Sequence, residues 1–202
     1  MTIRYLALFA TLSLAACTSA PTRYYTLVPG ENASQASTRT AAAGFQFEMQ
    51  PVRIPVQVDQ PQVVVRESNG ALAILETERW SAPLADEFHD SLSAEMERKL
   101  GIRDLAGLPK APGVAILSLQ TDVRRFDTVP GQYALIDVVW SISRRNEGDA
   151  RRSLTCSSVI RQSAGAGVQS VVLAHQQAIA TLATTIAGTA QRFAQGTGVG
   201  CP

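Results

Sequence analysis

The sequence predicts an α/β protein in which two long helices cover a mixed sheet that includes an antiparallel meander; an α+β arrangement is the alternative. The order of segments is the first observation: short alternating apolar and polar runs, a helical segment, three long strand-like runs and a second helical segment. Composition is the second, because 46% of the 202 residues are hydrophobic and 17% are charged, as in ordinary globular domains. We therefore expect a single domain over residues 24–202.

Short strands are expected in the first part of this domain, because apolar residues alternate there over a few positions at a time. A hairpin is expected around Asn69-Gly70, a pair typical of tight turns between strands. The polar, non-periodic segment at about 28–44 is expected to be a mobile loop. The expected strands cover 24–27, 45–52, 62–66 and 71–75.

The clearest helix is expected over residues 81–100. Its large apolar side chains recur every four residues, and Ser81 stands where an N-cap is preferred. Gly101 is well placed to end the helix. Packing decides that this helix forms, since each buried apolar side chain contributes about 1.5–3 kcal/mol and each charge near a helix end at most about 1. The stripe consists of Leu84, Phe88, Leu92, Met96 and Leu100.

The second half is expected to be a three-stranded meander followed by a long helix. Turn-forming residues separate the strand-like runs 114–126, 133–145 and 151–162. A helix is expected over about 168–194, where Val172, Ile179, Leu182, Ile186 and Phe193 form one stripe.

The first residues predict a secretion signal that ends at a lipid-modified cysteine. Residues 1–16 contain Arg4, an apolar run and small residues directly before Cys17. The apolar run has about a dozen residues, whereas a membrane-spanning helix needs about 20, so a transmembrane anchor is not expected. The sequence Leu14-Ala15-Ala16-Cys17 is similar to the bacterial lipobox, whose cysteine receives a diacylglycerol; a plain signal peptide before an unmodified cysteine is the alternative.

Lipidation at Cys17 would leave residues 17–23 as a short tether. The six residues between Cys17 and Tyr24 reach at most about 20 Å when extended, so the folded body is expected to sit close to its membrane. Thr18, rather than an aspartate, follows the cysteine, which by similarity to lipoprotein sorting in bacteria with two membranes indicates the outer membrane. The expected location is the periplasmic face of that membrane.

Cys156 and Cys201 remain after lipidation, in a compartment that favours oxidation. One interpretation joins them by a disulfide, which would stabilise the fold by roughly 4 kcal/mol on the chain-entropy model. The other is a buried thiol with a free cysteine in the tail. Mass spectrometry with and without reductant distinguishes the two.

Few residues suit catalysis, metal binding or nucleic-acid binding. Lys plus Arg number 18 against 17 Asp plus Glu, so the chain has no net positive field that would attract nucleic acid. Residues 150–202 carry four arginines (Arg151, Arg152, Arg161 and Arg192) and no acid; the expected interpretation is a solvated basic face, and a contact with anionic head groups or an acidic partner is the alternative. Asp86 and His89 share a helical face and are expected to pair at the surface, while His175 is expected at the edge of an apolar stripe, partly buried. Gly165 and Gly167 open a helix but lack the acidic residue of a dinucleotide site, so no cofactor and no metal are expected.

Three blocks of sequence together resemble one family. They are Tyr24-Tyr25-Thr26-Leu27, the run from Pro51 to Arg66 and Arg79-Trp80-Ser81-Ala82-Pro83-Leu84. Their order and spacing are similar to those of the ABC-type transport auxiliary lipoproteins of the PqiC type. Gln57-Val58 stands where that family often has Tyr-Leu.

The resemblance implies an α/β sandwich and an outer-membrane lipoprotein without catalytic residues. It also implies a paraquat-inducible or related transport system, in which proteins of the mammalian-cell-entry (MCE) class move lipids between membranes. The leading hypothesis is therefore a non-enzymatic component that docks such a transporter to the outer membrane, alone or as a homo-oligomeric ring. Arg79 and Trp80 are the candidate contact residues, with local packing as the structural alternative. Two further hypotheses are a periplasmic lipid-binding carrier and an anchored hydrolase acting through His89 or Asp86.

Overall fold

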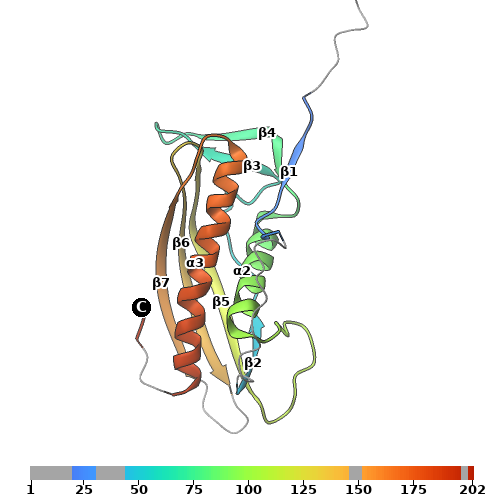
Figure 1. Cartoon of the computed structure of the whole chain (residues 1–202), viewed down its shortest axis with the longest axis vertical. Coiled ribbons are helices and arrows are strands. Elements are labelled where there is room, and N and C mark those ends of the chain that lie inside the picture. Colours follow the sequence, from blue (N-terminus) through green and yellow to red (C-terminus); the bar gives the residue numbers. More distant parts are fainter. Residues whose placement is uncertain (1–19, 31–43, 146–151, 197–199) are drawn as a thin grey trace, which may run out of the picture.

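The computed structural model describes residues 20–30, 44–145, 152–196 and 200–202. Within these residues, seven strands form two mixed sheets and two helices pack against the larger sheet (Figure 1). The predicted α/β class is confirmed, and the strands divide between two sheets. The predicted signal peptide at 1–16, Cys17 and most of the predicted loop at 28–44 lie outside the described residues.

The larger sheet has the strand order β2-β5-β6-β7. The antiparallel meander is present as predicted, and β2 adds to it in parallel with β5. Alternate side chains of the strands are buried under the helices, among them Phe47, Leu117 and Trp140, each 0% exposed. The strands are β2 (Phe45–Met49), β5 (Ala115–Val129), β6 (Tyr133–Arg145) and β7 (Arg152–Ser163).

Helix α2 (Leu84–Leu100) buries all five members of the predicted apolar stripe. The helix starts three residues later than expected, with Pro83 at the N-cap, so Ser81 does not cap it. A proline is favourable at a helix start because its fixed φ suits the first turn and a missing N–H costs nothing there. Gly101 ends the helix with φ at 69°, a conformation that favours glycine.

Helix α3 (Val168–Ala194) has 27 residues and is therefore about 40 Å long. It runs along the larger sheet and beside α2 (Figure 1). All five side chains of its predicted stripe are buried. Alanines lie between them on the buried face, and small side chains let the helix approach its neighbours closely.

The smaller sheet lies at the end of the molecule from which the N-terminal segment leaves (Figure 1). Its strand order is β1-β4-β3, with β1 parallel and β3 antiparallel to β4. The predicted hairpin at Asn69-Gly70 joins β3 to β4, and Gly70 has φ at 84°. The strands are β1 (Arg23–Tyr25), β3 (Gln62–Arg66) and β4 (Leu72–Trp80).

Candidate functional site

The N-terminal chain enters the folded body through a set of buried and half-buried polar contacts, which we call the anchor junction: Tyr25, Thr26 and Leu27 with Glu78, Glu87, Ser91 and Gln176. The first described residue, Ala20, is only three positions beyond Cys17. Ser81, after β4, donates its backbone N–H to the Tyr25 carbonyl over 2.8 Å. The junction therefore lies where a lipid-anchored tether would meet the domain.

Glu87 of α2 is the centre of the anchor junction. Its carboxylate is 3% exposed and accepts hydrogen bonds from the Leu27 backbone N–H and the Thr26 hydroxyl, each at 2.7 Å. The Ser81 hydroxyl donates to its other oxygen. Burying a carboxylate is costly unless its lone pairs are satisfied, and here donors from two separate parts of the chain satisfy them. Glu87 thus fastens the N-terminal chain to the start of α2.

Three further contacts hold the same segment. The Ser91 hydroxyl donates to the Leu27 carbonyl at 2.8 Å, and the Gln176 amide of α3 donates to the Thr26 carbonyl at 3.0 Å. The Tyr25 hydroxyl donates to Glu78 at 2.5 Å. Burial, and then this hydrogen bond to Glu78, raise the pKa of Tyr25, so the phenol stays protonated as a donor. The segment is therefore fixed to both helices and to β4.

The anchor junction was not predicted from the sequence. Glu87 stands beside Asp86 in the first turn of α2, and nothing in the local sequence distinguishes the two acids. Two partners of Glu87, namely Thr26 and Leu27, lie 61 and 60 positions earlier in the chain. A buried carboxylate of this kind is recognised only when the fold brings distant donors to it.

Arg79 and Trp80, the predicted contact pair, have different environments. Trp80 is 3% exposed and lies edge-on to Phe126, with ring centroids 6.1 Å apart. Arg79 is half-buried, sits opposite Tyr24 of β1 in the sheet register and makes no ion pair among the described residues. Trp80 therefore packs the body, and Arg79 is the member of the pair available for contact.

His175 is fully buried, rather than partly buried as expected. Its ring stacks on Phe126 with centroids 3.9 Å apart, and Nε2 lies 3.0 Å from the Thr128 hydroxyl. Burial lowers the pKa of His175 to about 3, so the imidazole is neutral at physiological pH. Together Trp80, Phe126 and His175 connect β4, β5 and α3, and we call this series the aromatic seam.

The predicted pair of Asp86 and His89 does not form. His89 Nδ1 lies 3.1 Å from the carboxylate of its sequence neighbour Asp90, and no contact joins it to Asp86 among the described residues. Gly167 directly precedes α3 with φ at 88°, which explains why a glycine stands there without invoking a phosphate. Within the described ranges no three His, Cys, Asp or Glu side chains gather as a metal site would require.

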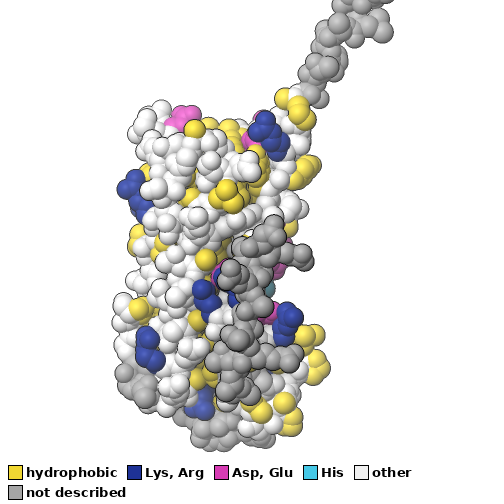
Figure 2. All heavy atoms as spheres, in the orientation of Figure 1, with side chains coloured by type: hydrophobic (Ala, Val, Ile, Leu, Met, Phe, Trp, Pro, Cys, Tyr) yellow, Lys and Arg dark blue, Asp and Glu magenta, His cyan; other side chains and the backbone are white. Residues whose placement is uncertain are grey.

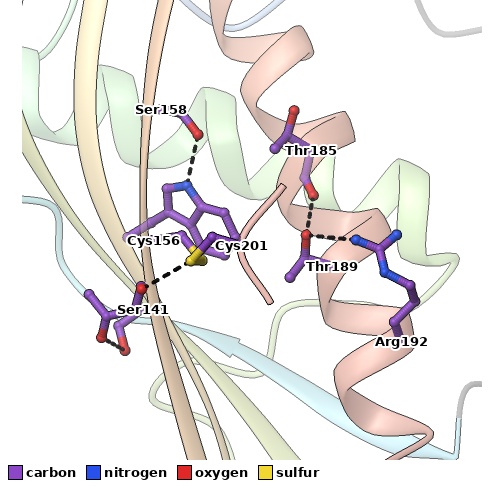
Figure 3. The surroundings of a disulfide bond; sticks show 9 residues. Ser141, Cys156, Ser158, Thr185, Thr189, Arg192 and Cys201 are labelled. Atoms are coloured by element: carbon purple, nitrogen blue, oxygen red, sulfur yellow. Dashed lines mark hydrogen bonds between the residues drawn. A yellow bond between two sulfur atoms is a disulfide. The ribbon is translucent and has the colours of Figure 1, made fainter. Parts of the chain in front are cut away.

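The structure contains a disulfide between Cys156 and Cys201, the first of the two interpretations considered (Figure 3). Cys156 lies on the inner, helix-facing side of β7 and is 4% exposed. The bond joins the end of the chain to β7, the edge strand of the larger sheet, and Cys201 itself stays exposed. Nearby, the Trp140 indole N–H donates to the Ser158 hydroxyl at 3.0 Å. The disulfide therefore fastens the C-terminal tail to the core.

The C-terminal arginines do not form one basic surface. Arg152 lies over the Phe193 ring and Arg161 over the Tyr133 ring, at 5.6 and 3.9 Å from the ring centroids. These two arginines stand nine positions apart on β7, which separates them by about 30 Å. Arg192 donates to Thr189, and Arg151 lies outside the described residues.

The uncovered face of the larger sheet carries a shallow hollow of about 260 Å³. Its lining is polar and includes Glu48, Ser118, Ser141 and Arg145. Such a lining does not suit an acyl chain, which binds among apolar side chains. Neither described helix is long and apolar enough to cross a bilayer.

Comparison with known proteins gives a family and a fold. Residues 25–187 match the profile of the ABC-type transport auxiliary lipoprotein component family. An uncharacterised protein of known crystal structure is 16% identical, with a TM-score of 0.62 over 84% of this chain and 98% of that one. A Xanthomonas campestris protein of the DUF330 family is 22% identical, with a TM-score of 0.57 over 86% and 98%. No curated protein sequence gives a significant match.

Proposed function

Because the chain belongs to the ABC-type transport auxiliary lipoprotein family, we propose that it is the lipid-anchored, non-catalytic component that docks a trans-envelope lipid transporter to the outer membrane. The anchor is an acyl group on Cys17, and the body lies on the periplasmic side. The transporter belongs to the MCE class or is an ABC permease. The family match over most of the domain is the observation that carries this proposal.

The anchor junction supports a docking role. A lipid anchor fixes only the end of a chain, and the body remains free to move unless the chain enters it rigidly. Glu87, Ser91 and Gln176 hold Thr26 and Leu27 through side chains of both helices. The body therefore begins seven residues from the membrane-bound cysteine, which suits a collar at the membrane surface better than a shuttle.

The packed core favours docking over the lipid-carrier alternative. A carrier needs an apolar cavity between the helices and the sheet, whereas large side chains occupy this layer. Phe47, Phe88 and Trp140 are each 0% exposed there. The polar hollow on the opposite face of the sheet does not replace such a cavity.

The anchor is tested by processing and fractionation of the full chain. Globomycin, which blocks lipoprotein signal peptidase, should cause the unprocessed precursor to accumulate, and Cys17→Ser should release the protein from membranes. A purified native protein that begins at Met1 and carries no acyl mass would contradict the anchor.

Docking is tested by crosslinking envelopes that contain the tagged full chain and identifying the co-purified proteins. An MCE-class protein or an ABC permease should be recovered with the native chain and lost with Cys17→Ser. Native mass spectrometry of the same preparation measures the number of copies. An acylated, membrane-bound monomer that never co-purifies with a transport protein would contradict docking.

A further inference from the structure

Exposed apolar side chains gather at the end of the molecule that the N-terminal chain leaves. Tyr24, Ile74 and Leu72 are 66%, 48% and 38% exposed, and all three belong to the small β1-β4-β3 sheet. Figure 2 shows hydrophobic side chains at this end, beside basic ones. Single exposed apolar residues are common on soluble proteins, but here three stand on one short sheet. Leu72 and Ile74 are two positions apart at the start of β4, and Tyr24 lies beside Arg79 near the end of that strand. We call Tyr24, Leu72 and Ile74 the apolar end patch.

The short tether between Cys17 and Tyr24 indicates that the apolar end patch faces the membrane. Tyr24 follows Cys17 by seven positions, which span at most about 25 Å. The opposite end of the body, where the loop containing Leu108 lies, is farther away by the length of α3, about 40 Å (Figure 1). A tether shorter than the body holds one end at high effective concentration beside the bilayer. That end is the one carrying the apolar end patch.

The chemistry of the patch fits a lipid surface. Tyrosine has an apolar ring with a polar tip and is enriched where membranes meet water. Arg23, whose side chain is 70% exposed, and Arg79 supply cations beside Tyr24. Glu76 and Glu78 lie on the same strand and offset these charges. Contact is therefore expected to depend on apolar burial more than on anionic lipid, and to change little with salt.

We propose that the apolar end patch lies in the headgroup region of the bilayer that holds the acyl group, so that the long axis of the body points away from the membrane. The inference rests on the proposed anchor at Cys17. It adds an orientation, which directs the end containing Leu108 toward the periplasm.

Single-cysteine labelling of the full acylated chain tests this orientation. Cys17 is acylated and Cys156 is bonded to Cys201, so an introduced cysteine is the free thiol. Ile74→Cys and Tyr24→Cys report on the patch, and Leu108→Cys is the control because Leu108 is 56% exposed at the opposite end. Each variant is labelled with an environment-sensitive dye and reconstituted into vesicles of phosphatidylethanolamine and phosphatidylglycerol.

Headgroup-quencher lipids should quench the labels at positions 74 and 24 at least about twofold more than the label at 108, with a blue-shifted emission. Equal quenching at all three positions in vesicle-bound protein would overturn the orientation and leave the anchor intact. Protein that does not float with vesicles would instead show that the anchor itself is wrong. A label at 74 that is shielded from water but not quenched by lipid would assign the patch to a second copy of the chain, and would also overturn the proposal.

Discussion

The two sheets are stabilised in different ways. The larger sheet and its helices supply most of the apolar core, which Val63, Val64 and Trp80 of the smaller sheet also join, and a disulfide closes one edge. The smaller sheet has a first strand of only three residues, and polar contacts to Glu78 and Glu87 hold the chain around it. This difference separates two tasks: the larger sheet stabilises the body, and the smaller one fixes the body to its tether.

The aromatic seam is where the two sheets meet. Trp80 comes from the smaller sheet, Phe126 from the larger one and His175 from α3. A change within the larger sheet should therefore lower global stability, whereas a change at the anchor junction should free the N-terminal chain first. A change in the seam should affect both.

Within the larger sheet, the largest effect is expected from removing the disulfide. The bond closes a loop of 45 positions, for which the chain-entropy model gives about 4 kcal/mol. We expect Cys156→Ala with Cys201→Ala to lower the free energy of unfolding by about this amount in urea titrations. Reductant should destabilise the native protein similarly and leave the double variant unchanged. Two alkylatable thiols in the untreated native protein would contradict the bond.

A smaller and more local effect is expected from Glu87→Ala in the anchor junction. The change leaves the buried Leu27 N–H and the Thr26 and Ser81 hydroxyls without their acceptor, at a cost of about 3 kcal/mol. Hydrogen exchange should accelerate at the Leu27 amide before it does in β5 or β6.

Glu87→Gln is the matched control for this change, because its amide oxygen still accepts a hydrogen bond from Leu27. It should recover more than half of the lost protection. If Glu87→Ala accelerates hydrogen exchange equally in both sheets, the anchor junction does not open independently of the larger sheet, and the contrast between the two sheets is wrong.

The contrast between apolar packing and polar contacts also explains which features of the fold could be predicted from the sequence. The stripe from Leu84 to Leu100 and the meander were predicted from the spacing of apolar residues. This works because such spacing places the apolar side chains on one face of the helix or strand, and burying that face is favourable whichever element packs on it. Spacing does not specify partners, so the division into two sheets and the pairing of β1 with β4 were not predicted. The role of Glu87 and the full burial of His175 were not predicted for a related reason: burial of a polar group depends on donors and rings that distant segments bring to it.

A change in pH should act on the aromatic seam through His175. Its pKa is about 3 in the folded protein and about 6.5 when unfolded, so the unfolded state binds more protons between these values. Stability should therefore fall as pH falls below about 6.5, by about 1.5 kcal/mol between pH 6.5 and 5.

Urea titrations at several pH values measure this slope. His175→Gln should flatten it, and His89→Gln is the matched control because it changes a histidine outside the aromatic seam. A slope unchanged by His175→Gln would show that other groups cause it.

The smallest effect on stability is expected from Arg79→Ala. The side chain is half-buried on β4 and makes no ion pair within the described part of the chain, so unfolding should change by less than about 0.5 kcal/mol. Trp80→Ala, one position away, should cost about 3–5 kcal/mol because it removes a buried ring that packs on Phe126. A contact role for Arg79 therefore requires that Arg79→Ala weaken association with the membrane or a partner while the free energy of unfolding is unchanged. If Arg79→Ala destabilises the protein as much as Trp80→Ala does, Arg79 belongs to the packing of the smaller sheet, and the contact surface lies elsewhere on that end.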